Sequence, residues 1–261
     1  MIKFFRKIRQ QLLVENRLTK YLLYAIGEIV LVVIGILLAL QFNTWRMENK
    51  DREIELVILK KMKVDLGNDV QDLKRLKKFN TTQNEICIRL LEYMIDESKP
   101  LEDTLQFNND FQQIVFYSLP KSNNTSYQLA INTGYLNKIS SDSLVIELSN
   151  YYNNSFIENH FRDTERFINI YSENNLMLKY PMFSKIALVN DGHGEKYALD
   201  RYRNDKRPLL QLRDIRGKIS LENFLNSLSM RLIIGIKAVD IKQKWAQNLI
   251  LSIDNQRKKI K

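Results

Sequence analysis

The chain has 261 residues, 40 of them basic and 30 acidic, and a formal net charge of +10. Hydrophobic residues make up 44% of the sequence, which is enough to bury a core and excludes a wholly disordered chain. The 8 glycines and 4 prolines are few for this length and favour helices, while the single cysteine excludes an intramolecular disulfide and a thiolate zinc cluster.

Residues 1–20 predict a basic amphipathic segment on the cytoplasmic side of a membrane, since apolar side chains recur there at spacings of three and four. The cations expected to contact anionic lipids of the inner leaflet are Lys3, Arg6, Lys7 and Arg9. The alternative is a charged tail that only sets topology. About half of the net +10 comes from this segment, so we expect membrane electrostatics and no nucleic-acid partner.

Residues 21–42 predict a transmembrane helix. The stretch Tyr21–Leu40 contains one ionisable side chain, Glu28, and a helix of about 20 residues spans the ~30 Å of a bilayer core. The stretch ends without the small-x-small cleavage site of a signal peptide. Tyr21, Tyr24 and Trp45 are the expected interfacial anchors.

The charges flanking this stretch predict its orientation. Lys and Arg dominate before it, whereas acidic residues balance them just after it. By the positive-inside rule, the N-terminus faces the cytoplasm and the rest of the chain lies in the periplasm, outside a bacterial inner membrane. The only other apolar run, Leu232–Ile236, is far too short to span.

Glu28 is the one residue of the predicted helix that is costly to place in lipid, at about 2.5–3.5 kcal/mol for a charged group. Gly35 follows one heptad later on the same face, and Gly35 and Ala39 form a small-x3-small pair. Together with Gly27, they predict a stripe where a second copy or a partner helix approaches closely. The alternatives are a neutral Glu28 facing lipid, and a proton-conducting role.

The remainder of the chain predicts an all-α fold, with an amphipathic stalk or first bundle helix over 43–80, a helical bundle over 81–256 and a basic tail over 257–261. Leu59, Met62, Leu66, Leu73 and Leu76 form the apolar stripe of the first helix, and Asp69 interrupts it. Further helices are expected over 82–96, 104–119, 126–132 and 157–178, and Gly134 is the expected left-handed C-cap of the helix over 126–132. Another helix is expected to begin after an N-cap at Ser141 or Asp142, and a final long helix after an N-cap at Ser220. Residues 190–194 suggest a turn.

Little in the sequence suggests catalysis, and we expect no cofactor, no metal and no enzymatic activity. His160 lies two residues after Glu158, the wrong spacing for two ligands on one helical face, and His193 is a loop residue between glycines. Cys87 has apolar neighbours and is expected to be buried. A possible contact for anionic headgroups or an acidic partner is the basic patch of Arg201, Arg203, Arg207, Arg213 and Arg216.

The segments MIKFFRKIRQQLL and KYLLYAIGEIVLVVIGILLALQFNTW, followed by TSYQLAINTGYLNKISSDSLVIELSNYY, resemble a family of bacterial single-span membrane proteins known as a domain of unknown function. The resemblance is closest from Met1 to Trp45. It implies the single-span topology and the importance of the Glu28 region, and it implies no activity, substrate or cofactor.

These observations favour a membrane-anchored periplasmic scaffold that self-associates through its span and binds another periplasmic protein. One alternative is a small subunit of a proton-driven membrane complex that uses Glu28, by analogy of architecture. The other is a ligand-sensing helical bundle, which would ordinarily need a second span or a cytoplasmic output domain.

Overall fold

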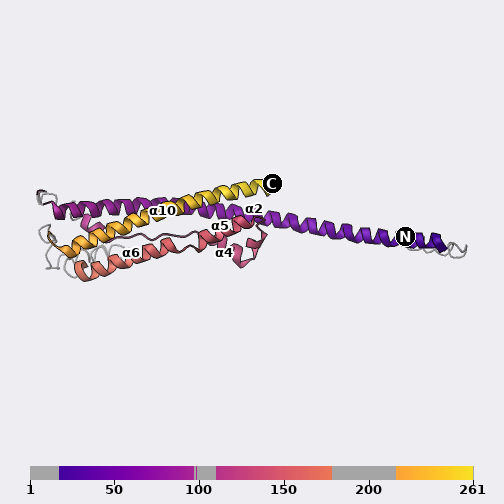
Figure 1. The fold of residues 1–261 in the computed structure, drawn as a ribbon, viewed down its shortest axis with the longest axis horizontal. Helices are drawn as coiled ribbons and strands as arrows, with labels where there is room; N and C mark the ends of the chain where they lie inside the picture. The colour runs from indigo at the N-terminus through magenta and orange to yellow at the C-terminus, as the bar shows by residue number, and fades with distance from the viewer. Residues whose placement is uncertain (1–17, 97, 99–109, 178–215, 261) are drawn as a thin grey trace, which may run out of the picture. The chain divides into compact units, whose positions relative to one another are not determined.

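The computed structural model describes residues 18–96, 98, 110–177 and 216–260. These residues are predominantly helical, and no strand occurs among them, which confirms the predicted all-α class (Figure 1). Several predicted features lie outside the described residues: the cationic side chains Lys3, Arg6, Lys7 and Arg9, the turn at 190–194 with His193, and the arginines from Arg201 to Arg213.

The chain divides into two compact units, residues 1–57 and residues 58–261. Helix α2 (Leu18–Ile95) contributes residues to both units. The prediction of a separate helix over 82–96 is wrong, because α2 continues through Asn80 and Thr81 without a break. Asn80 is buried, and the Thr81 hydroxyl donates to the carbonyl of Lys77, one turn earlier, so neither polar residue ends the helix.

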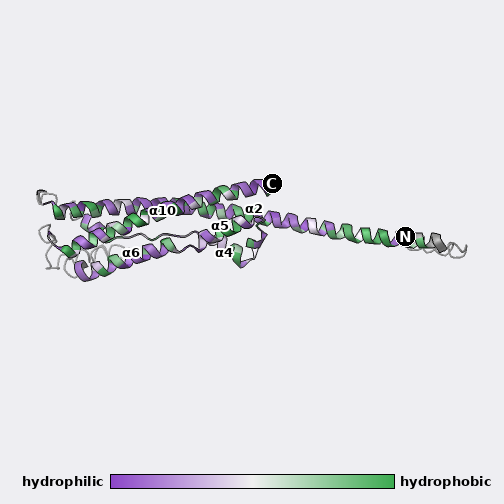
Figure 2. Ribbon diagram, in the orientation of Figure 1, coloured by the Kyte–Doolittle hydropathy of each residue, from purple (hydrophilic) through white to green (hydrophobic). Residues whose placement is uncertain are grey.

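The first unit contains the apolar segment, here residues 25–42, which is strongly hydrophobic along α2 (Figure 2). Its large apolar side chains are 47% exposed at Val33 and up to 73% exposed at Leu31. Within the described part of the chain, α2 is the helix long and apolar enough to cross a membrane, and none of its most apolar window is buried.

The second unit is a helical bundle whose core consists of three apolar clusters along α2, α5 (Asp142–Asn153), α6 (Phe156–Ser172) and α10 (Ile219–Ile260). Leu59 and Leu66 pack with Leu249 in the first cluster, Leu73 packs with Val239 in the second, and Leu90 packs with Leu225 in the third. The order along α10 is the reverse of that along α2, so the two helices are antiparallel. The predicted apolar stripe of the first bundle helix is buried as expected.

The predicted helix over 104–119 is wrong in its described second half. A helical turn covers 110–113, and residues 116–124 have no regular secondary structure. Phe111 and Ile114 are fully buried as anchors of the third cluster, whereas Leu119 is 41% exposed. Apolar spacing indicated a helix here because it records which residues are buried and does not report the backbone path between them.

Local sequence features explain most of the other helix boundaries. Helix α4 (Thr125–Asn132) is followed by Gly134 at φ 71°, the predicted left-handed residue, and then by the 3-10 turn η1 (Tyr135–Lys138). Ser141 caps α5 by accepting from the Leu144 N–H at 3.4 Å.

The ends of the two longer helices, α6 and α10, can be compared with their predicted positions. A π-helical turn, η2 (Glu173–Met177), extends α6 close to the predicted end at 178. Helix α10 already includes Ser220, so the prediction of Ser220 as its cap is wrong. The same helix continues through Ile260 and includes most of the predicted basic tail.

Candidate functional site

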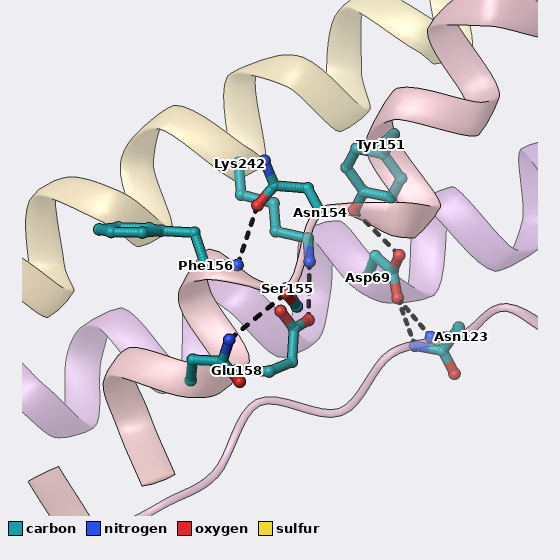
Figure 3. Close-up of polar contacts among 9 residues, drawn as sticks. Asp69, Asn123, Tyr151, Asn154, Ser155, Phe156, Glu158 and Lys242 are labelled. Carbon is teal, nitrogen blue, oxygen red and sulfur yellow. Dashed lines mark hydrogen bonds and ion pairs between the residues drawn. The ribbon is translucent and has the colours of Figure 1, made fainter. Parts of the chain in front are cut away.

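Among the described residues, a network of buried polar side chains surrounds the junction of α5 and α6. It combines Asp69 of α2, Asn123 of the non-helical stretch, Tyr151 of α5, Glu158 of α6 and Lys242 of α10 (Figure 3). The junction itself is a short break between the two helices, where the Asn154 side chain accepts from the Phe156 N–H at 3.2 Å. Because Asn competes for backbone hydrogen bonds at helix ends, it favours such a break.

Asp69 is the centre of this arrangement and is only 3% exposed. Its Oδ1 accepts from the Asn123 backbone N–H and from Asn123 Nδ2, both at 2.8 Å, and its Oδ2 accepts from the Tyr151 hydroxyl at 2.9 Å. Burial raises the pKa of the Asp69 carboxyl, although the Asn123 and Tyr151 hydrogen bonds and the charge of Lys242 all oppose this effect. Asp69 therefore ties α2 to both the non-helical stretch and α5.

Lys242 and Glu158 form an ion pair inside the bundle. Lys242 Nζ lies 2.8 Å from Glu158 Oε1, and the two side chains are 10% and 24% exposed. The same ammonium lies 5.4 Å from the centroid of the Tyr151 ring, close enough for a cation–π contact. Glu158 Oε2 has no hydrogen-bond partner among the described residues. The pair links α10 to the first turn of α6.

Aromatic rings enclose the polar groups. Tyr152 stacks on Tyr127 with 4.5 Å between ring centroids, and Tyr151 meets Trp245 edge to face at 5.6 Å. Burial, followed by nearby acidic groups, raises the pKa of both Tyr151 and Tyr152, so both phenols stay protonated at neutral pH. The Tyr151 hydroxyl donates to Asp69, whereas the Tyr152 hydroxyl is buried and has no hydrogen-bond partner among the described residues. Phenols held neutral in this way are not activated nucleophiles.

A second set of polar contacts lies near the boundary of the second and third apolar clusters. The Ser229 hydroxyl donates to Asn84 Oδ1 at 2.6 Å, and His160 Nε2 donates to the Arg231 carbonyl at 2.9 Å. A Cβ placed on Gly235 would lie 3.2 Å from Phe161 Cζ, so glycine allows α6 and α10 to approach closely. His160 thus has a packing role, in agreement with its unfavourable spacing for metal binding.

The residues predicted for helix contact lie in or beside the apolar segment. A Cβ on Gly27 or on Gly35 would meet nothing within 4 Å, so neither glycine is needed for packing within this chain. Glu28 and Ala39 are exposed on the same helix. The side chains of Tyr21 and Tyr24 lie outside the described part of the structure, whereas Trp45 is 57% exposed and its ring lies 5.8 Å from that of Phe42.

Two other predictions concern single side chains. Arg216, the described member of the basic patch, donates to the carbonyls of Tyr93 and Asp96 at 3.2 and 3.0 Å, so it caps the end of α2. Cys87 is fully buried, and burial raises the pKa of its thiol to about 12.

The sequence offered partial indications of the polar arrangement. Asp69 interrupts an apolar stripe, and Lys242 lies at core spacing between Val239 and Ala246. Either interruption could have suggested a buried polar layer, since a charged residue at a core position needs a partner. Asn123 lies in a polar, non-helical stretch, and nothing in its local sequence identifies it as the partner of Asp69.

Comparison with known protein families shows which family the chain belongs to. The profile of the family of unknown function DUF6090 matches residues 28–172, more than half of the chain. The chain belongs to this family. The matched region begins at Glu28 and includes Asp69, Asn123, Tyr151 and Glu158, while Lys242 lies beyond it. Comparisons with curated proteins and with solved structures gave no match.

Proposed function

We propose that this DUF6090 protein is a non-enzymatic scaffold, anchored in a bacterial inner membrane by residues 21–42, that self-associates through this helix. Its N-terminus lies in the cytoplasm, and its bundle binds a partner protein in the periplasm. The observation that carries the proposal is the exposure of the apolar segment, which includes Leu31 at 73%. Such a surface is stable when lipid or another apolar helix covers it.

The contact stripe supports self-association in addition to simple anchoring. At 100° per residue, Gly35 and Ala39 lie within about 20° of Glu28 around the helix. Small residues allow two helices to approach closely, and a carboxyl group in the same stripe can share a hydrogen bond across the contact. The open space around Gly35 is compatible with a second helix.

The polar chemistry of the bundle supports a scaffold in preference to an enzyme. Tyr151 and Asp69 bond to each other, the Lys242 ammonium bonds to Glu158, and the pKa of Cys87 is raised to about 12 by burial. The hydrogen-bonded groups hold helices together, and burial raises the pKa of Tyr151 and of Cys87, which is the opposite of what activates a nucleophile.

The mass of the full-length protein in mild detergent tests the proposal. We expect an oligomer for wild type, and a shift towards monomer for Gly35→Leu, because the added side chain blocks close approach. Val33→Leu is the matched control, since it places the same side chain on the opposite face and should leave the mass unchanged. If the wild-type protein were monomeric, self-association would be rejected, and the apolar segment would act only as a membrane anchor.

Two substitutions at Glu28 separate hydrogen bonding from charge. Glu28→Gln keeps a donor and acceptor in the stripe and should largely preserve assembly, whereas Glu28→Leu removes both and should weaken it. Equal masses for these two variants would exclude an interhelical hydrogen bond from residue 28.

A further inference from the structure

Residues 116–124 form a non-helical stretch that is fixed at both ends, here called the docking strand. The docking strand runs as a thin tube along the bundle (Figure 1). Near its start, Glu165 of α6 interacts with the Tyr117 hydroxyl and is the main cause of the raised pKa of Tyr117. Near its end, Asn123 donates twice to Asp69 at 2.8 Å (Figure 3). The backbone is thus held in place before any partner binds, which lowers the entropic cost of binding.

The burial pattern between these two fixed points is that of a β-strand. Side chains 116, 118 and 120 are half-buried, whereas Tyr117, Leu119 and Lys121 are exposed. Alternation with a period of two places every second side chain on the bundle. Yet no backbone hydrogen bond joins residues 117–122 to the described part of the chain. With respect to the described residues, the main-chain groups of 117–122 are therefore unpaired.

The two edges of this strand differ in their donors. In an extended chain, successive residues direct their N–H and C=O groups to opposite sides. Pro120 has no N–H, so the edge of residues 118, 120 and 122 lacks its central donor. The edge of residues 117, 119 and 121 retains every donor and acceptor, and it is the one suited to pairing with another strand.

A groove of about 380 Å³ lies between the docking strand and α2. Its lining includes the apolar side chains of Leu76, Phe79 and Leu119. On α2, the groove extends from Asp72 to Phe79, a length of about 10 Å, which matches three to four residues of an extended peptide. The groove can accept apolar side chains that project from a strand paired with the edge.

The charges at the groove favour an acidic occupant. Lys121 is exposed, and Arg75, whose side chain is 79% exposed, lies 2.8 Å from Asp72. Positive charge at a binding rim steers acidic partners towards it.

We propose that the docking strand and its groove bind an extended segment of a partner protein with alternating apolar and acidic residues, by main-chain pairing along the edge of residues 117, 119 and 121. This is β-augmentation, in which the main chain supplies affinity and the pockets supply selectivity. The inference names a partner class for the bundle and so builds on the function proposed above.

The experiment uses full-length protein in detergent and fluorescent heptapeptides in which glutamate alternates with valine, leucine or phenylalanine. We expect saturable binding, measured by fluorescence anisotropy, for at least one peptide. N-methylation of alternate peptide nitrogens removes main-chain donors and should weaken binding about tenfold or more. Lysine in place of glutamate should weaken it as well.

Matched variants of the protein locate the site. Lys121→Glu should weaken binding of the acidic peptide about tenfold, whereas Lys237→Glu makes the same charge change at an exposed position of α10 and should have no effect. Leu119→Pro removes one donor from the pairing edge and should also weaken binding. Circular dichroism must show that each variant keeps its helix content.

Several results would overturn the inference. They are the absence of binding by every acidic peptide up to about 1 mM, equal binding of the N-methylated peptide, or equal loss with Lys121→Glu and Lys237→Glu. Equal competition by N-methylated and lysine peptides would indicate an apolar ligand such as a lipid chain, and would also overturn it.

Oligomeric mass, recorded on the same samples, separates the two proposals. Peptide binding by a monomeric protein would support peptide binding at the docking strand and would reject self-association through the span. An oligomer that binds no acidic peptide would reject peptide binding at the docking strand and would support self-association through the span. Lys121→Glu should not change the mass, since residue 121 lies far along the chain from the apolar segment.

Discussion

Helix α2 carries the same apolar residue types in two regions with opposite environments. In the apolar segment, Leu37 is 58% exposed and Leu38 is 62% exposed, whereas Leu59 and Leu66 are fully buried in the bundle. Helix propensity is similar in both regions, so it explains the helix and not the difference. The bundle covers its leucines with α5 and α10, and no described residue buries the most apolar part of the segment.

Polar residues also have different surroundings in the two regions. In the bundle, Asp69 and Lys242 have named partners on other helices, and their layers separate the apolar clusters. Fixed polar layers define which turns of α2 and α10 lie together, because a shifted register would leave buried groups unpaired. In the apolar segment, Glu28 lies among exposed apolar side chains of the same helix.

The same substitution made in each region tests this difference most directly. Leu66→Ala should lower the free energy of unfolding of the bundle by about 3–4 kcal/mol, because it leaves a cavity in the first cluster. Leu37→Ala should leave it nearly unchanged, since that side chain is not part of the core. Urea unfolding of the full-length protein, followed by circular dichroism, measures both. A large effect of Leu37→Ala would show that the apolar segment contributes to bundle stability.

Asp69→Leu tests whether the polar layer stabilises the bundle. The substitution leaves the Asn123 donors and the Tyr151 hydroxyl without their acceptor, and should destabilise the bundle by about 3 kcal/mol. Asp69→Asn, which keeps one acceptor oxygen, should cost about half as much. If leucine were tolerated as well as asparagine, the hydrogen bonds of Asp69 would contribute nothing net.

The sequence predicted the helices and the core far better than it predicted this polar layer. Periodic apolar residues such as Leu59 and Leu66 identify a buried face, because burial recurs with the helical repeat. The pairing of Asp69 with Asn123 joins residues 54 positions apart, and only the path of the docking strand brings them together. Local patterns contain no information about that path, which is also why the helix over 104–119 was wrongly extended to Leu119.

Substitutions of Lys242 and Glu158 test how much the ion pair between them contributes to the stability of the bundle. Lys242→Met alone should destabilise the bundle by about 2 kcal/mol, because it leaves a poorly solvated carboxylate without its cation. Adding Glu158→Leu should recover most of that loss. The double variant serves as the control for lost packing. If it were as unstable as the sum of both single variants, the pair itself would have no coupling energy.

Two glycines in different surroundings give a smaller and more specific test. Gly67→Ala should stabilise the bundle by about 0.5–1 kcal/mol, since alanine favours helix and a Cβ there meets nothing within 4 Å. Gly235→Ala gains the same propensity, but its Cβ would lie 3.2 Å from Phe161 Cζ. It should therefore be less favourable than Gly67→Ala, and Gly235→Val should be clearly destabilising. Equal gains at both positions would mean that α6 and α10 separate easily.

The pH dependence of stability shows which force dominates at Asp69. Because burial raises its pKa above 3.8 in the folded protein, the folded state binds more protons than the unfolded state above that pH. This contribution to stability is complete below pH 3.8 and is lost as the pH rises through the folded-state pKa.

Asp69→Asn does not titrate and provides the reference. Relative to this variant, wild type should become less stable as the pH rises from 3.8 towards neutral. Urea unfolding of both proteins across this range measures the difference directly. A wild type that instead gains stability with rising pH would mean that the donors from Asn123 and Tyr151, with the charge of Lys242, outweigh the cost of burying the carboxylate.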